Sequence, residues 1–115
     1  MFGLMANAAK RKGERAEREA AEMLTELLGL PMRRKLGAGR LDDIGDLDGL
    51  QDCVIQVADW PSDTLRAVRE KPVAAEVQRL QANAPFAMTA IRMRGGLWRI
   101  VQTPEQWAQL YRATV

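Results

Sequence analysis

The sequence has no histidine, a single cysteine and few aromatic residues among its 115 positions. A disulfide framework needs paired cysteines and a Cys/His zinc site needs several such ligands, so both kinds of site are excluded. No apolar run approaches the roughly 20 residues that span a bilayer, so we expect no membrane partner. The opening residues are too short for a signal peptide and have no basic residue before them. Together with the lone thiol, this predicts a protein of a reducing, cytoplasmic compartment.

Length and composition predict one globular domain over residues 1–115. The hydrophobic share of 47% and the charged share of 28% are typical of folded proteins, which argues against long disordered regions. Only residues 1–11 are expected to lie outside the core, as a flexible N-terminal arm.

The net charge of +2 conceals a segregated pattern. Residues 1–40 contain nine Lys or Arg against five Glu, and residues 64–115 contain eight against three. Between them, residues 41–63 contain seven Asp and no Lys or Arg. Two basic blocks around an acidic centre fit a phosphate-binding rim around a metal-binding floor. The alternative is that these charges simply solvate the surface.

Hydrophobic periodicity and turn residues predict an α/β (α+β) fold, with a small mixed β-sheet flanked by helices in the order α-β-β-β-α-β-β-α. The capping box of Thr103 and Gln106 starts the last helix, and Pro72 is expected at the first position of a separate helical run to residue 82. The predicted elements are helix 13–28, strands 31–36, 44–47 and 53–58, helical segments from 61 to 82, strands 86–93 and 97–101, and a final helix from 104.

Glu17 is the carboxylate of the first predicted helix that falls inside its apolar stripe. At about 100° per residue, six apolar side chains form that stripe: Ala16, Ala20, Met23, Leu24, Leu27 and Leu28. A carboxylate that faces a core is costly unless it is paired, hydrogen-bonded or bound to a metal. We therefore interpret Glu17 as a candidate site residue. The alternative is pairing with a core-edge arginine, Arg33 or Arg34.

Asp46 lies on a short predicted strand between Ile44 and Leu47. Aspartate is depleted in strands, so an aspartate there usually has a partner or a ligand. Magnesium is commonly held by one or two carboxylates together with waters and substrate phosphate. This makes Asp46 a candidate metal ligand. Whether it forms part of a site depends on which residues lie opposite it across the hairpin.

The next predicted strand has Gln56 and Ala58 on one face, because side chains alternate along a strand. If that face lies toward Asp46, Gln56 offers a neutral oxygen to a metal or to its bound water, whereas Ala58 offers no polar group. A nuclease needs a second anionic ligand and a lysine at such positions. The alternative is an ordinary buried strand.

The spacing of these motifs resembles one nuclease family over most of the chain, roughly from residue 12 to residue 104. The run Lys12-Gly13-Glu14-Arg15-Ala16-Glu17-Arg18-Glu19 resembles the opening helix of the archaeal-type Holliday junction resolvases of the PD-(D/E)XK nuclease superfamily. That family continues with a basic strand, a small-residue loop, a strand aspartate, an Ile-Glu-Val-Lys strand and a final strand. Five segments look like these in order: Met32-Arg33-Arg34, Gly37-Ala38-Gly39, Asp46, Ile55-Gln56-Val57-Ala58 and Leu97-Trp98-Arg99-Ile100-Val101. The compact spacing is similar to the shorter phage members.

The resemblance implies a Mg²⁺-dependent endonuclease that acts on branched DNA in a bacterium or a phage-infected host. It implies that Glu17 and Asp46 bind the ion and that Gln56 stands where the family has its catalytic glutamate. It also implies a homodimer, because such resolvases cut two opposed strands symmetrically. Phosphate contacts, which set position rather than read sequence, are expected from six basic residues: Arg11, Lys12, Arg33, Arg34, Lys35 and Arg40.

The chain departs from the family at Gln56 and Ala58, where the family has glutamate and lysine. Losing one transition-state electrostatic group typically costs about 10²–10³ in rate, so an active enzyme needs replacements. The candidate replacements are cations of the following helix and an aspartate that turns inward: Lys71, Arg66, Arg69 and Asp59. The alternative function is a nuclease-fold protein that no longer cleaves and binds DNA or a protein, in an accessory or decoy role.

The apolar side chains of the final helix are Trp107, Leu110 and Tyr111. We expect them to be buried either in the core or in the interface of the dimer. The sequence leaves both alternatives open.

Overall fold

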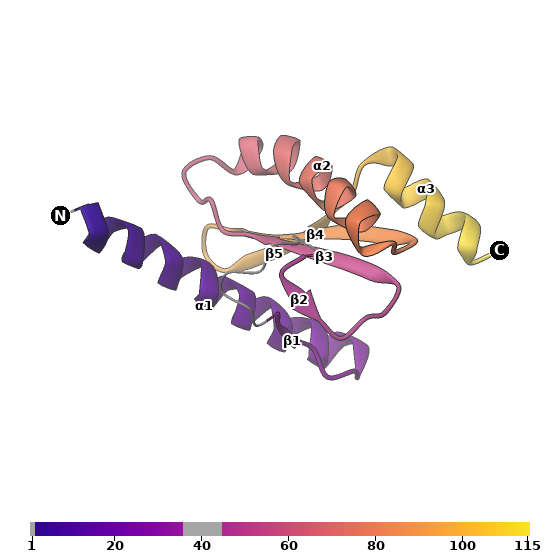
Figure 1. Cartoon of the computed structure of the whole chain (residues 1–115), viewed down its shortest axis with the longest axis horizontal. Helices are drawn as coiled ribbons and strands as arrows, with labels where there is room; N and C mark the ends of the chain where they lie inside the picture. The colour runs from indigo at the N-terminus through magenta and orange to yellow at the C-terminus, as the bar shows by residue number, and fades with distance from the viewer. Residues whose placement is uncertain (1, 36–44) are drawn as a thin grey trace.

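The elements follow the order α-β-β-β-α-β-β-α that the sequence predicts (Figure 1). The computed structural model describes residues 2–35 and 45–115, with side chains from Ala8 onward. The described elements are α1 Phe2–Leu28, β1 Arg33–Arg34, β2 Leu47–Asp48, β3 Cys53–Ala58, α2 Thr64–Ala82, β4 Phe86–Met93, β5 Leu97–Val101 and α3 Pro104–Ala113. They form a compact α+β fold.

β3, β4 and β5 form a mixed three-stranded sheet with β4 in the centre. β3 and β4 run parallel, with Cys53 opposite Phe86, and α2 makes the crossover that a parallel pair requires. β4 and β5 run antiparallel. The predicted hairpin between them is confirmed, and its turn uses Gly95 and Gly96, which both have positive φ.

β1 and β2 form a second, short antiparallel pair. The chain just before β2 approaches β3, where the N–H of Asp46 donates to the Ile55 carbonyl at 2.8 Å. Gly45 has φ +105° and allows this approach, because a Cβ there would lie 2.9 Å from Val54 Cγ1. Glycine at position 45 therefore sets how closely Asp46 lies against β3.

The three-stranded sheet lies between α1 and α2 (Figure 1). On β3, Ile55 and Val57 pack in one core cluster with the alanine and leucine stripe of α1. Val54 and Ala58 pack in other clusters with buried alanines of α2. Because both faces of β3 are covered, the chemistry of a β3 residue depends on which helix it faces.

α1 begins at Phe2, whereas the sequence predicted a start at Gly13. Residues 2–11, expected as a flexible arm, are helical, and in Figure 1 they extend outward beyond the sheet. Alanine, lysine and arginine favour a helix here without any apolar stripe. The regular spacing of apolar residues, on which the predicted start at Gly13 rested, begins only where the helix packs against the sheet. The mobility of this end stays a prediction.

α2 is one helix, and the prediction of a separate run starting at Pro72 is wrong. Pro72 lies inside the helix and is buried, and its carbonyl accepts a hydrogen bond from Gln106 Nε2 of α3 at 3.0 Å. The predicted helix opening is confirmed, with Asp63 as the N-cap residue. The tie to α3 fixes the middle of α2 over the sheet.

The ranges of β3, β4 and β5 agree with the predicted strands, and the Thr103–Gln106 capping box is present. β1 is shorter than the predicted 31–36, and β2 lies later than the predicted 44–47. Leu36 and Ile44, which bound those predictions, lie outside the described residues. Within residues 2–35 and 45–115, no helix is long and apolar enough to cross a membrane.

Candidate functional site

Glu17 is held by Arg34, as the pairing alternative predicted. Arg34 Nε donates to Glu17 Oε1 at 3.0 Å, and its guanidinium also lies 3.6 Å from Glu14 Oε1. The Arg34 and Glu17 side chains are each exposed by less than a quarter, at 24% and 23%. Two carboxylates therefore share one guanidinium, which leaves Arg34 paired with Glu14 if Glu17 binds another cation.

Asp46 is fastened to β3 through its side chain as well as its backbone. Its Oδ2 accepts the N–H of Val57 at 2.8 Å, two residues beyond its backbone bond to Ile55. A carboxylate that accepts a backbone N–H makes a strong, charge-assisted bond. Asp46 therefore ties the residue just before β2 to the second half of β3.

Gln56 and Ala58 lie on the face of β3 that α2 covers. Ala58 is 3% exposed and packs with Ala67 and Ile91. Gln56 is 6% exposed, and its Oε1 is buried without a hydrogen-bond partner among the described residues. Glu17 lies on α1, on the other side of the sheet. The buried-strand alternative is therefore confirmed for both side chains.

The next residue, Asp59, borders a hollow of about 280 Å³ between α1 and the end of β3. We call this the first hollow. Its polar lining consists of Lys12 and Glu17 from α1, together with Asp59 and the Trp60 ring. Val57, whose N–H binds Asp46, forms part of its wall. Two carboxylates and one lysine are thus gathered at the end of β3.

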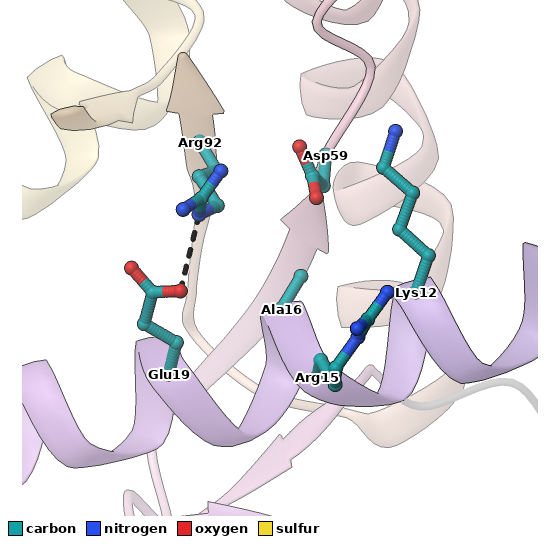
Figure 2. A pocket seen from close by; sticks show the side chains of 6 residues that line it. All are labelled: Lys12, Arg15, Ala16, Glu19, Asp59 and Arg92. Carbon is teal, nitrogen blue, oxygen red and sulfur yellow. Dashed lines mark hydrogen bonds and ion pairs between the residues drawn. The ribbon is translucent and has the colours of Figure 1, made fainter. Parts of the chain in front are cut away.

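A second hollow, of about 330 Å³, lies beside the first and is drawn in Figure 2. Lys12, Arg15 and Glu19 reach it from α1, Arg92 from β4, and Asp59 from the end of β3. Arg92 Nε donates to Glu19 Oε2 at 3.1 Å. Three cations, Lys12, Arg15 and Arg92, therefore line the second hollow. Asp59 lines both the first and the second hollow.

Lys12 and Asp59 line both hollows. Asp59 Oδ1 is buried and has no hydrogen-bond partner among the described residues. Within the same parts of the chain, Lys12 and Arg15 make neither a hydrogen bond nor an ion pair. A buried carboxylate oxygen without a partner is costly in the absence of a ligand, whereas Lys12 and Arg15 are exposed to solvent.

Two of the three predicted replacement cations, Arg66 and Lys71, lie against Trp60. Lys71 Nζ is 4.7 Å and Arg66 Cζ is 5.3 Å from the centroid of the Trp60 ring, both within the range of cation–π attraction. Arg66 also pairs with Glu70 at 2.7 Å. These cations support a wall of the first hollow, whereas Lys12 lines it directly.

The residues expected to contact phosphate differ in their surroundings. Arg11 and Lys12 are exposed on α1, and Arg33 is exposed on β1. Lys35 Nζ lies 3.4 Å from Asp48 Oδ1, and Arg34 is engaged with the two glutamates of α1. Arg40 lies outside the described residues.

Sequence reasoning missed Arg15, Glu19 and Arg92 and did not connect Lys12 with a pocket. A signal was present in the helix: Lys12, Arg15 and Glu19 recur at i, i+3 and i+7 and therefore share one face. Arg92 is the one charged residue in the β4 sequence. No sequence feature indicated that β4 would bring Arg92 beside α1.

The described residues contain no group of three or more Asp, Glu, Cys or His that could hold a metal ion. Glu17 and Asp59 nevertheless line one hollow, and Asp59 offers an unpaired oxygen toward this region. Magnesium is often held by one or two carboxylates plus water and substrate phosphate. An ion at these two residues would need water and a ligand to complete its coordination, and Glu17 is already paired with Arg34.

Comparisons with protein-family models, curated proteins and solved structures find no match to this chain.

Proposed function

We propose that this chain is a Holliday junction resolvase-like, Mg²⁺-dependent endonuclease acting on branched DNA in a bacterial or phage-infected cytoplasm. The main support is the first hollow, where Glu17, Asp59 and Lys12 meet at the end of β3 beside the anchored Asp46. The order of an opening helix, three strands, a crossover helix and a parallel strand is similar to the nuclease superfamily and supports the same proposal.

The proposed reaction is hydrolysis of one phosphodiester bond. A water oxygen forms a bond to phosphorus, the bond from phosphorus to the leaving sugar oxygen breaks, and that oxygen takes up a proton. Magnesium held by Glu17, Asp46 and Asp59 would supply Lewis acidity and an activated water. Lys12 and Arg15 offset the negative charge on the phosphate, and Asp46 keeps the end of β3 in place.

The protruding part of α1 provides the proposed contact with the DNA backbone. Arg11, Arg15 and Arg18 line another hollow along this helix. Such contacts set position without reading sequence and make the affinity depend on salt. A junction presents phosphates from several arms, which suits a basic helix that extends beyond the sheet (Figure 1).

The proposed homodimer would use α3. Trp107 and Tyr111 stack at a centroid distance of 5.4 Å, and both rings are more than half exposed, at 58% and 54%. With Leu110 also exposed, the expectation that these side chains are buried in the core of one chain is wrong. Aromatic residues are enriched in the buried centres of protein interfaces, which supports the interface alternative.

The test is cleavage of a synthetic four-way junction in Mg²⁺ or Mn²⁺ by the wild type, Asp46→Asn and the matched control Asp48→Asn. Asparagine keeps an oxygen for the Val57 N–H but removes the charge, so cleavage should fall by about 100-fold or more. The control should stay within about threefold, because Asp48 pairs with Lys35 away from the hollow. Equal cleavage by all three proteins, or none by the wild type, contradicts the proposal.

A second candidate function is junction binding without cleavage. The observation that favours it is the burial of Gln56 and Ala58 under α2, together with the neutralisation of Glu17 by Arg34. Fluorescence anisotropy on the same junction in EDTA distinguishes it. Tight, salt-sensitive binding with no cleavage in either metal supports this candidate and overturns the enzyme.

A further inference from the structure

β5 lies at an edge of the three-stranded sheet. It pairs with β4 on one side, and no strand of residues 2–35 and 45–115 pairs with its other side. Leu97 is 53% and Ile100 is 48% exposed, and Arg99 between them is exposed as well. Proteins usually shorten, bulge, charge or cover their edge strands, because an open edge can pair with another chain. β5 has one charged residue, no proline and a regular register with β4.

The open edge of β5 presents the backbone groups of Trp98 and Ile100. In an antiparallel pair, alternate residues exchange hydrogen bonds with the partner strand, and the residues between them point away from it. Arg99 Nη1 donates to the Trp98 carbonyl at 2.8 Å at an exposed position, which places that carbonyl at the open edge. Ile100 is two residues farther along the strand, so its N–H and carbonyl lie at the same edge.

The side chains of β5 divide between the two faces of the sheet. Trp98 faces α1, because its Nε1 donates to Glu19 Oε1 at 3.0 Å, and strand alternation places Ile100 on the same face. Arg99 and Val101 lie on the other face, where Val101 packs in the cluster below α2. A strand added at this edge would therefore meet apolar side chains on the α1 face and a guanidinium on the other.

The charge beside this edge has one sign. Residues 86–101 contain Arg92, Arg94 and Arg99 and no Asp or Glu. Arg92 is paired with Glu19. Arg94 and Arg99 donate to backbone carbonyls and form no ion pair within the described parts of the chain. An acidic partner therefore complements the edge, since opposite charges across a strand pair are stabilising.

A second copy of β5 fits the edge less well. Two such strands related by a two-fold axis exchange the most backbone bonds when Trp98 of one copy lies opposite Ile100 of the other. That register places the Arg99 side chains of the two copies directly opposite each other, and like charges in that position are destabilising. Arg99 therefore disfavours self-pairing and favours a strand with a carboxylate at that place.

We propose that the outer edge of β5 binds an extended acidic segment of a partner protein, which joins the sheet as an antiparallel strand beside β5. Its backbone bonds to the outward groups of Trp98 and Ile100, and its central carboxylate lies opposite Arg99. The apolar side chains next to that carboxylate pack beside Trp98 and Ile100. No β5 residue lines either of the two hollows described above, so this surface goes beyond the proposed function.

Binding is tested by fluorescence anisotropy of the full chain with a labelled probe, Val-Thr-Val-Glu-Val-Thr-Val with blocked ends. Its alternation places the glutamate on the Arg99 face and the two neighbouring valines beside Trp98 and Ile100. The matched control probe has N-methyl groups on those two valines, which removes the N–H groups that face β5. It should bind at least about tenfold more weakly. Equal binding of both probes, or no binding of either at millimolar protein, overturns the proposal.

Arg99→Glu tests the preference for an acidic strand. It should weaken binding of the glutamate probe about fivefold or more and strengthen binding of a probe with lysine in the centre. Lys10→Glu makes the same charge change at an exposed residue on the protruding part of α1, and it should bind both probes like the wild type. An unchanged preference in Arg99→Glu, or the same shift in Lys10→Glu, overturns the acidic partner.

Amide hydrogen exchange, followed by NMR, locates the bound probe. Exchange at Trp98 and Ile100 should slow about tenfold or more, because their N–H groups gain acceptors. The amides of Leu97, Arg99 and Val101 already face β4 and should change little. Protection that appears elsewhere in the chain and not at Trp98 and Ile100 overturns the site.

Sedimentation velocity of the free chain tests the second copy as the occupant. Ile100→Pro removes one outward N–H, and proline is tolerated at an edge where that group points to solvent. Circular dichroism shows that the variant is folded. Self-association that Ile100→Pro abolishes and Trp107→Ala leaves unchanged would place a second copy on β5 and overturn the acidic strand. None of these measurements involves junction cleavage, so their failure and that of the proposed function are distinguishable.

Discussion

The two faces of β3 differ in what they enclose. Toward α2, Gln56 and its register neighbour Thr89 on β4 each have a buried oxygen with no partner among the described residues. Toward α1, Asp59 directly follows the last residue of the strand and lines two hollows together with Lys12.

Of the two motif positions, Gln56 lies under α2, whereas Ala58 packs with Ala67 and Ile91 and also borders the first hollow beside Asp59. Under the proposed function, a match by sequence position alone would assign chemistry to Gln56, on the face opposite Asp59.

The strongest way to break this comparison is to rebuild the family motif with Gln56→Glu and Ala58→Lys together. Both sites are nearly fully buried. Gln56 lies under α2, and Ala58 packs with Ala67 and Ile91 at the edge of the first hollow, so the pair would place two charges among tightly packed apolar side chains. We expect the free energy of unfolding to fall by about 3–5 kcal/mol, with no gain in junction cleavage. Urea unfolding measures the loss.

The matched control for that variant is Gln81→Glu with Ala113→Lys, the same substitutions at exposed helix positions. It should change the stability by less than about 0.5 kcal/mol. A clear gain in cleavage by the rebuilt motif in a stable protein would contradict the account and place the catalytic face under α2.

A smaller effect is expected at the junction of the two strand pairs. Asp46→Ala removes the acceptor of the Val57 N–H and should lower the free energy of unfolding by about 1–3 kcal/mol. Asp46→Asn keeps an oxygen acceptor and should retain most of that stability while losing cleavage. Urea unfolding of the two variants makes the comparison. Equal destabilisation by both would mean that the charge, rather than the hydrogen bond, fixes Asp46 on β3.

A still smaller change is expected for Gln56→Met, which keeps the side-chain length and removes a buried oxygen that lacks a partner in the described parts of the chain. The stability should stay within about 1 kcal/mol of the wild type or rise. A loss of more than about 2 kcal/mol in urea unfolding would show that this amide makes a stabilising bond.

The smallest effect concerns the first residue of β3. Burial, followed by the charge of Asp52, raises the pKa of the Cys53 thiol from 9.0 to about 11. Alkylation by iodoacetamide should therefore be slow at pH 8 and accelerate toward pH 11. Because the folded thiol keeps its proton above the unfolded pKa, its contribution to stability is present below pH 9 and declines as the pH rises toward 11. Rapid alkylation of the folded protein at pH 8 would contradict this.

Much of the fold could be predicted from the sequence, because β3, β4 and β5 have clear apolar runs and a glycine turn. The start of α1 and the continuity of α2 through Pro72 could not. The early start of α1 depends on the helix propensity of residues that form no apolar face. The second depends on tertiary support, since the Pro72 carbonyl is bonded by Gln106 from a distant helix. Local patterns contain neither kind of information.

The candidate site was predictable only in part. The helical stripe singled out Glu17 and offered Arg33 or Arg34 as its partner, of which Arg34 forms the bond. Strand chemistry singled out Asp46. Gln56 lies on the opposite side of β3 from Glu17, because α2 covers one face of the strand and α1 the other. The sequence pattern does not specify which helix covers which face. Arg92 reaches the hollow through the parallel pairing of β3 and β4, which no local pattern specifies.

The most direct test of the central claim, that the reactive side of β3 faces α1, is four-way-junction cleavage in Mn²⁺ by Asp59→Asn and Gln56→Met. One substitution lies at each face, and both replace a side chain by one of similar size. We predict that Asp59→Asn lowers cleavage about 100-fold or more and that Gln56→Met stays within about threefold of the wild type. Loss of cleavage in Gln56→Met with full activity in Asp59→Asn would contradict the account.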